Sequence, residues 1–315
     1  DEADQTREIV QTAVRAEIFN DGKEALPLSG GLDSGIILDC LTDYDNLILL
    51  SGALPTTVDH VVAVERAKSS GRHLECVDSH SRAESAIWHR QATELPSMDG
   101  RNVLAISALA KKNGRSVIIS GLGPDEFLHG YALTSVGLRT WLDRSKNIFS
   151  RISKPFCEWK NASSYVYVRG FRRLDLLQAR YDISSSEIRK SMEQLEQSLA
   201  FSETHCGTNS ISAFYLFNQL IPDADQYSSY FGIEARVPFL NLSVIKHFKK
   251  LEIKYGFLGL NKRALRHSFP NVSKDTPLFK RGFSIGEVVS ANEGDKKKPE
   301  LNSDRKMAVL RDYFD

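Results

Sequence analysis

Short apolar runs alternate with longer segments of helical spacing through the first 120 residues of the chain. Short runs with few polar residues are typical of strands inside a parallel sheet. The longer segments repeat apolar residues every three or four positions, which is typical of helices. Pro27 lies in the first run, so we expect that strand to be short or irregular, because proline cannot donate a ladder hydrogen bond. The predicted strands are residues 25–28, 47–50, 74–77 and 117–119, and the predicted helices are residues 6–19, 34–42, 57–69, 81–93 and 102–112.

Strands that alternate with helices predict an α/β fold with one parallel sheet and helices on both faces. From about residue 134 onward helical patterns dominate, for example at residues 186–200 and 211–221. The sequence therefore predicts one domain over residues 1–290 with a helical C-terminal extension. Its expected parts are an α/β core at about 20–135, a helical part at about 136–290 and a C-terminal tail at 291–315.

The turn after the first predicted strand reads Ser-Gly-Gly-Leu-Asp-Ser, residues 29–34. Two adjacent glycines allow a sharp turn and leave the backbone amides uncovered, and the amides that open the next helix lie at its positive end. Ser29 and Ser34 add hydroxyl donors. Asp33 would repel a phosphate unless a cation lay between them, so the loop predicts a site for pyrophosphate with Mg²⁺. The simpler alternative is a glycine turn with a serine or aspartate helix cap.

A second glycine turn, Ser-Gly-Leu-Gly-Pro-Asp-Glu at residues 120–126, follows the fourth predicted strand. Ligands of parallel sheets bind beyond the carboxyl ends of the strands, where Ser51 and Asp78 are also expected. Asp125 should therefore lie at the same sheet edge as Asp33, and one Mg²⁺ between them would orient a leaving pyrophosphate. A Gly-Pro-Asp turn that caps a helix explains this motif equally well.

Two later motifs are less specific when each is taken alone. Residues 234–241 read EARVPFLN, which predicts an ordinary ion pair at a helix end. Residues 280–284 read KRGFS and follow Lys262 and the Leu265-Arg266 pair. A lysine beside a glycine turn can reach into a site and meet developing negative charge, although solvated lysines are more common.

Composition excludes several classes of function. The 315 residues are 41% hydrophobic, enough for a large core, and 41 Lys+Arg against 40 Asp+Glu give a formal charge of +1. No overall field therefore points to nucleic acid or to a membrane. The four cysteines form no CxxC pair, which leaves a structural zinc site unsupported and favours a reducing, cytoplasmic location. We find no membrane span or signal peptide, and the sequence leaves the oligomeric state open.

The first motif resembles the SGGxDS loop, or PP-loop, of the ATP pyrophosphatases. The whole series SGGLDS, SGLGPDEFLHGY, EARVPFLN, KRALR and KRGFS resembles the synthetase domain of the asparagine synthetase family, from about residue 5 to 290. This resemblance implies an adenine-nucleotide α-hydrolase-like fold. It also implies an ATP-dependent carbon–nitrogen ligase, which adenylates a carboxylate, releases pyrophosphate, and forms an amide and AMP when an amine attacks.

The resemblance also implies roles for individual residues. Asp33 and Asp125 would act in catalysis and bind Mg²⁺, and Lys280 would stabilise charge on the phosphate during adenylation. Asp225 and Glu234 match acidic positions that we interpret as mostly architectural. The residues implied to bind ATP or its pyrophosphate are Leu28, Ser29, Gly30, Gly31, Asp33, Ser34, Ser51, Ser120 and Gly121.

The sequence departs from the family pattern at Leu122 and Asn241. Asparagine synthetases have glutamate at the position of Leu122, and β-lactam-forming relatives have tyrosine there. Leucine neither takes nor gives a proton, so the amine must be activated differently. Asn241 replaces an aspartate, which is a milder change. The N-terminal cysteine of a glutaminase domain is missing, so ammonia would come from a separate glutaminase domain or chain unless free ammonia or a larger substrate supplies the amine.

Three hypotheses follow for function. The default is conversion of aspartate to asparagine by an AMP-forming amide ligase. The second keeps this chemistry but joins the carboxylate and amine of a peptide or natural product, as β-lactam synthetases and lasso-peptide cyclases do; Leu122 motivates it. The third is a non-catalytic nucleotide-binding homologue, against which the retained Asp33, Asp125 and Lys280 argue.

Overall fold

The computed structural model describes residues 1–19, 21–92, 100–128, 130, 216–255 and 262–276. Several sequence predictions fall elsewhere. The predicted helix at 186–200, the KRGFS motif with Lys280, and the tail at 291–315 lie outside the described residues. Within the described ranges, every helix is too short or too polar to span a lipid bilayer.

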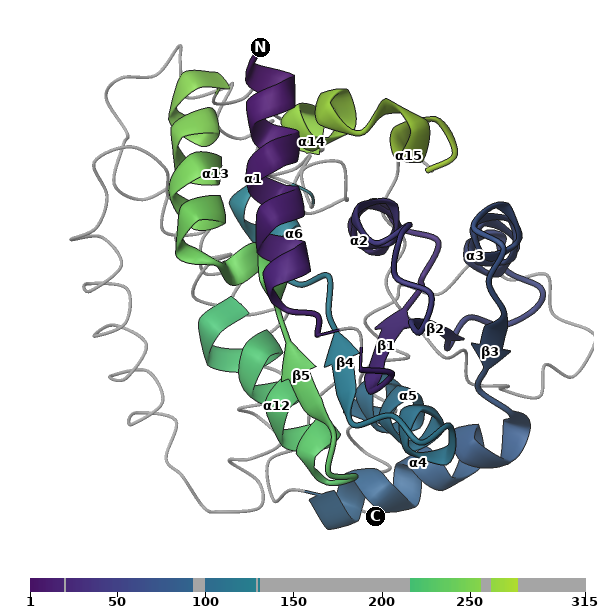
Figure 1. Cartoon of the computed structure of the whole chain (residues 1–315). Helices are drawn as coiled ribbons and strands as arrows, with labels where there is room; N and C mark the ends of the chain where they lie inside the picture. The colour runs from purple at the N-terminus through teal and green to yellow at the C-terminus, as the bar shows by residue number, and fades with distance from the viewer. Residues whose placement is uncertain (20, 93–99, 129, 131–215, 256–261, 277–315) are drawn as a thin grey trace, which may run out of the picture.

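In the described part of the chain five strands form one sheet, in which all neighbours are parallel and the order is β3-β2-β1-β4-β5. The sheet confirms the predicted α/β class, and its strand order reverses between β1 and β4 (Figure 1). Ligands of open α/β sheets bind at such a reversal, beyond the carboxyl ends of the strands. The strands are β1 (Glu24–Pro27), β2 (Ile48–Ser51), β3 (Leu74–Cys76), β4 (Val117–Ile119) and β5 (Glu234–Arg236).

The fifth strand corrects one prediction. EARVPFLN was expected to place an ion pair at a helix end, but Glu234–Arg236 pair with Val117–Ile119 as the edge strand of the sheet. The ion pair itself exists, with Arg236 Nε 2.9 Å from Glu234 Oε1. The two charged residues lie two positions apart, so they project from the same face of the strand. A segment far beyond residue 135 thus completes the α/β core.

Pro27 ends β1, and the strand is as short as its sequence predicted. Leu28 N donates to Leu50 O at 2.7 Å, and successive peptide groups of a strand face opposite neighbours. Pro27 therefore faces β4, where the paired register ends at Ala25, and its missing N–H breaks no ladder bond. Because the pairing of β1 with β4 ends before Pro27, the segments that follow these two strands turn into separate loops.

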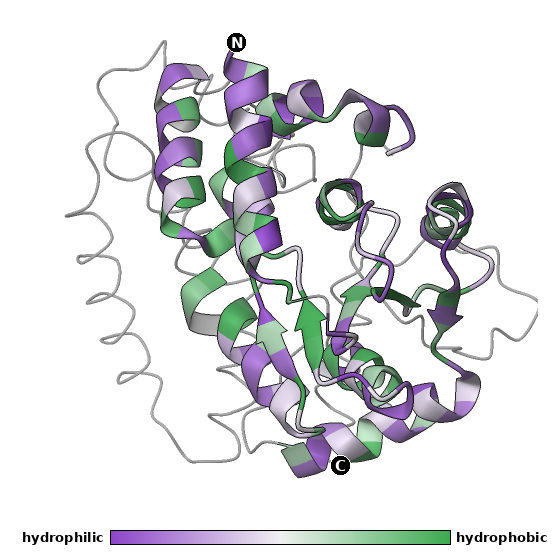
Figure 2. Cartoon of the chain, in the orientation of Figure 1, coloured by the Kyte–Doolittle hydropathy of each residue, from purple (hydrophilic) through white to green (hydrophobic). Residues whose placement is uncertain are grey.

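Alternate strand residues build one core on each face of the sheet. On one face Leu26, Leu49 and Ile119 pack with buried residues of the first three helices and of the helices after residue 240. On the other face Ala25, Leu50 and Ile118 pack against the helix that precedes β4. Burial on both faces selects unbroken apolar strands, and Figure 2 shows β4 hydrophobic along its whole length.

The helices surround this sheet, and local signals explain several of their ends. Asp1 and Asp4 form a capping box at the start of the first helix, and Thr57 accepts from His60 N at the start of the third. Of the predicted helix at 211–221, residues 211–215 lie outside the described chain. The remainder is helical, as a π-helix at Leu216–Leu220 that leads into an α-helix ending at Ser229. The α-helices are α1 (Glu2–Ala16), α2 (Leu32–Cys40), α3 (Val58–Ser69), α4 (Ser79–Ala92), α5 (Gly100–Lys112), α6 (Pro124–Phe127), α12 (Ile221–Ser229), α13 (Leu242–Tyr255), α14 (Arg263–Ser268) and α15 (Pro270–Lys274).

Candidate active site

The loop of residues 29–34, called the PP-loop below because its sequence resembles the SGGxDS loop, connects β1 to α2 and requires glycine at its second position. Gly30 has a φ of 74°, in the left-handed region that favours glycine. A Cβ at Gly30 would also overlap the carbonyl oxygen of Asp59 at the start of α3. Gly31 is the N-cap of α2 and offers no side chain to the first helical amides. The helix therefore opens with donors that suit an anion.

Both serines of the PP-loop hydrogen-bond within the loop. Gly31 N donates to Ser29 Oγ at 3.3 Å, and Ser29 N donates to Ser34 Oγ at 3.3 Å. The two hydroxyl oxygens lie 3.2 Å apart. These contacts tie the first residue of the loop to the first turn of α2. The predicted contact of Ser29 and Ser34 with pyrophosphate stays a prediction.

The loop after β4 turns at Gly123, whose φ is 118°, and Pro124 opens the short helix α6. Glu126 accepts a hydrogen bond from Gly123 N at 3.2 Å, so this carboxylate caps its own helix. A helix-capping Gly-Pro-Asp turn was one of the two explanations of the motif, and for Glu126 it is correct. The loop also touches the PP-loop, since a Cβ at Gly121 would lie 3.1 Å from Asp33 Cβ.

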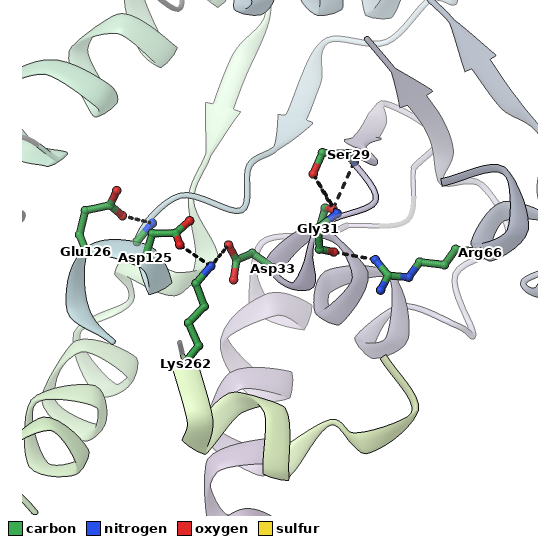
Figure 3. Close-up of polar contacts among 9 residues, drawn as sticks. Ser29, Gly31, Asp33, Arg66, Asp125, Glu126 and Lys262 are labelled. Atoms are coloured by element: carbon green, nitrogen blue, oxygen red, sulfur yellow. Dashed lines mark hydrogen bonds and ion pairs between the residues drawn. The ribbon is translucent and has the colours of Figure 1, made fainter. Parts of the chain in front are cut away.

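Asp33 and Asp125 converge on one lysine to which the sequence alone assigned no role. Lys262 Nζ lies 2.6 Å from Asp33 Oδ2 and 2.7 Å from Asp125 Oδ1 (Figure 3). The side chains of Lys262, Asp33 and Asp125 are only 7%, 15% and 6% exposed, so the three charges interact through little water. The structure therefore brings the two predicted aspartates together, with an ammonium group between them.

The backbone of Lys262 is shaped for this contact. Its φ of 57° makes it the one non-glycine residue in the left-handed region among the residues described, a conformation that costs about 1 kcal/mol. Lys262 N donates to Leu128 O at 3.0 Å, which fixes the residue to the end of α6. Burial alone would lower the pKa of Lys262, but Asp125 and Asp33 outweigh burial and raise that pKa, so the ammonium stays charged.

Gly130 leaves the room that this cluster needs. A Cβ at this position would overlap Asp125 Oδ1 and would lie 2.5 Å from Lys262 Cε. Gly130 N also donates to Asp125 O at 2.9 Å. The glycine that follows the DEF segment in the sequence is therefore required by close packing of the site rather than by an unusual backbone angle.

The other predicted site residues take up different positions. Ser51 is buried at the end of β2, where its hydroxyl accepts from Ala53 N at 3.3 Å. Ser120 N donates to Arg236 O at 2.7 Å, so β5 holds the end of β4. Leu28 is fully buried in the core. The predicted catalytic Lys280 lies outside the described part of the chain.

The acidic residues that we interpreted as architectural have contacts of their own. The exposed Glu234 pairs with Arg236, which lowers the pKa of the Glu234 carboxyl. Asp225 is exposed on α12, where its carbonyl oxygen accepts hydrogen bonds from the Ser228 and Ser229 hydroxyls. Glu234 therefore pairs with a neighbour on its own strand, and the bonds of Asp225 are made by its backbone, so an architectural role of its carboxylate stays a prediction. Asp33 and Asp125 instead pair with Lys262.

Comparison with known proteins adds two findings to this geometry. The sequence profile of the asparagine synthase family matches residues 5–281. The amidase chyE of Penicillium rubens is 29% identical over an aligned region that covers 38% of this chain and 21% of the amidase. The chain thus spans about a fifth of the length of this curated relative.

Proposed function

The chain belongs to the asparagine synthase family, a family of ATP-dependent amide ligases, and from this premise we propose that it adenylates a carboxylate and passes the acyl group to an amine. The observation that carries the proposal is the convergence of Asp33 and Asp125 on Lys262 at the reversal of strand order. Two glycine loops supply the aspartates, and the uncapped start of α2 supplies backbone donors. Together they form a site suited to a charged triphosphate.

Mg²⁺ fits the donor set of this site. Asp33 and Asp125 offer carboxylate oxygens, the ligand type that Mg²⁺ prefers, side by side at the Lys262 ammonium. Among the residues described there is no group of three or more metal-binding side chains. Mg²⁺ is usually held by one or two carboxylates together with substrate phosphates, so Asp33 and Asp125 would hold an ion that arrives with ATP. When bound, Mg²⁺ would offset the charge of the triphosphate.

The proposed reaction has two steps whose atoms balance. An oxygen of the substrate carboxylate attacks the α-phosphorus, the bond from that phosphorus to the bridging oxygen breaks, and pyrophosphate leaves. The amine nitrogen then attacks the acyl carbon, AMP leaves, and one proton is released. Lys262 would stabilise the negative charge that accumulates on the departing pyrophosphate, and Lys280 is proposed to act on the α-phosphate.

The default substrates are aspartate and ammonia, with a separate glutaminase domain or chain as one source of ammonia. Leu122 favours a second candidate, an amide ligase or cyclase that acts on a peptide or another natural product. Its side chain is half-buried in the loop after β4 and cannot accept the proton of an incoming amine. The similarity to a protein named as an amidase supports amide chemistry in general.

The test is exchange of labelled pyrophosphate into ATP in the presence of a panel of carboxylic acids. We expect exchange with one class of acid, and a loss on the order of 100-fold or more in Asp33→Asn and Asp125→Asn. Asp39→Asn is the matched control, because Asp39 lies on the same helix as Asp33 but forms a long, half-exposed ion pair with Arg7 at 3.9 Å. Binding of ATP without exchange for any acid would instead favour a non-catalytic nucleotide-binding protein.

Amide formation then separates the two ligase candidates. Aspartate with ammonia should give asparagine under the default proposal. Turnover of a substrate with its own amine, and none with ammonia, would assign the chain to the cyclase or tailoring class. Full exchange in both aspartate variants would contradict the proposed site itself.

A further inference from the structure

A partly buried arginine lies beneath the PP-loop. Arg66, on α3, donates through Nη1 to the carbonyl oxygens of Gly30 at 3.1 Å and Gly31 at 2.6 Å (Figure 3). Through Nη2 it donates to Val272 O at 3.0 Å and to the hydroxyl of Thr276. One guanidinium therefore joins three segments: α3, the PP-loop and the end of α15.

The sequence of α2 makes room for this guanidinium. A Cβ at Gly35 would lie 2.5 Å from Arg66 Nη1 and 2.7 Å from Val272 Cγ1. Gly35 lies inside the nine-residue helix α2, where glycine costs about 1 kcal/mol relative to alanine. The helix gives up this stability at the position where the arginine passes beneath the loop.

The charge of Arg66 is not cancelled by a direct ion pair in the described part of the chain. The hydrogen-bond acceptors of its guanidinium there are neutral oxygens, three backbone carbonyls and one hydroxyl. Burial lowers the pKa of Arg66 and Asp275 opposes that shift, but a guanidinium stays protonated at neutral pH. Its positive potential therefore reaches the loop above it.

We propose that Arg66 is a positioning residue for the pyrophosphate part of ATP, an inference that rests on the proposed function. The C=O and N–H of one peptide unit point in opposite directions. Binding the Gly31 carbonyl to Arg66 therefore turns the amide of Leu32 toward the opposite side, where the phosphates would lie. The guanidinium also adds positive potential beneath the loop, which favours an anion above it.

Arg72 provides a matched control for a purely structural role. It follows α3 closely and likewise donates to backbone carbonyls, those of Leu41 at 2.7 Å and Tyr44 at 2.7 Å. These carbonyls lie in the connection from α2 to β2, which enters β2 at its amino end. The PP-loop lies at the other end of the strands, where their carboxyl ends are. Loss of either arginine removes several hydrogen bonds, but only Arg66 contacts the PP-loop.

The experiment measures affinity by calorimetry, with Mg²⁺ present, for ATP, inorganic pyrophosphate and adenosine. Each protein is used at a temperature where circular dichroism shows it folded. In Arg66→Met we expect affinity for ATP and pyrophosphate to fall about tenfold, while adenosine affinity changes less than about twofold. Arg66→Lys keeps the charge and should fall between the wild type and Arg66→Met. Arg72→Met should bind all three ligands as the wild type does.

A smaller change keeps the inference testable if Arg66→Met does not fold. Thr276→Val removes one acceptor of Arg66 and leaves the charge, so pyrophosphate affinity should fall about threefold with adenosine affinity unchanged. Equal losses for all three ligands, or no loss of pyrophosphate affinity, would overturn the role of Arg66. Failure of the wild type to bind ATP would contradict the proposed function instead.

Discussion

The loops after β1 and β4 each bring an aspartate to Lys262, but different contacts hold the two loops in place. Each leaves a central strand, turns at a glycine with positive φ, and places an aspartate in the first turn of a helix beside Lys262. The loop after β4 is held by its own residues, since Glu126 caps Gly123 and Pro124 opens the helix. The PP-loop has the internal hydrogen bonds of its two serines and is also held from outside, by Arg66 and by close packing against the backbone of Asp59.

This difference predicts how each loop responds to change. A loop that carries its own cap depends on a few neighbouring residues, whereas the PP-loop depends on how α3 and α15 are packed. Lys262 is the point at which the two loops meet, so its loss should affect both. The expected effects become smaller with distance from that shared contact.

The largest effect is expected for Lys262→Met. Without the ammonium, two buried carboxylates face each other, and the charge that offsets the departing pyrophosphate is lost. We expect pyrophosphate exchange to fall on the order of 100-fold. Because Mg²⁺ would replace the missing positive charge, the variant should gain more in melting temperature from MgCl₂ than the wild type does. Equal gains in both proteins would contradict a shared cation site.

Gly130→Ala should disturb the same cluster through volume alone. The added Cβ overlaps Asp125 Oδ1 and crowds Lys262 Cε, so we expect a loss of about 1–3 kcal/mol in the free energy of unfolding and a clear loss of exchange. Gly71→Ala is the control, because a Cβ added at Gly71 would meet no atom within 4 Å. The φ of Gly71 is 67°, so this substitution strains the backbone without crowding a neighbour. It should cost about 1 kcal/mol and leave exchange unchanged. Denaturant unfolding and exchange rates measure both effects.

Glu126→Ala tests the self-capped loop directly. Losing the bond to Gly123 N should cost about 0.5–2 kcal/mol of stability, with a smaller loss of exchange than at Lys262. Glu126→Gln keeps an acceptor oxygen and should recover most of that stability. If Glu126→Gln were as damaging as Glu126→Ala, the charge of Glu126 rather than its capping bond would matter.

The smallest effect concerns His247, which lies outside both loops on α13. Burial lowers the pKa of His247 from 6.5, Lys250 adds to this, Glu2 opposes it, and Nε2 lies 2.8 Å from Thr6 Oγ1. The unfolded chain binds the proton more readily, so the stability due to neutral His247 is present above about pH 6.5 and declines as the pH falls below that value. His247→Gln should flatten the dependence of unfolding free energy on pH in the range below about 6.5. Pyrophosphate affinity at pH 7.5 should not change.

Much of the fold was predictable because its signals are local. Three of the predicted strands, β1, β2 and β4, are mostly buried, and burial on both faces makes such apolar runs distinctive. The edge strand β3 contains Glu75 and is only partly buried. The strand β5 was missed because charged residues at both of its ends leave no apolar run, as is common in edge strands. Its place in the sheet depends on pairing with β4, which no local pattern encodes.

The candidate site likewise contains residues that the sequence predicted and residues that it did not. Glycine turns after strands, each followed by an aspartate, are visible in the sequence, and the parallel sheet dictates that their ends share one edge. Lys262 is separated from Asp33 by 229 positions, and Arg66 from Val272 by 206. The only sequence signal for Lys262 was its place at the head of the KRALR motif, and Arg66 had none.

The sequence by itself determined four of the five strands, the two glycine loops and the aspartates that they carry, because backbone freedom, apolar periodicity and helix capping act over a few residues. Only the tertiary structure decided which cations meet those loops. A lysine or arginine reaches whichever acceptors the packed helices bring within its length, and that packing minimises the energy of the whole chain rather than of any one segment.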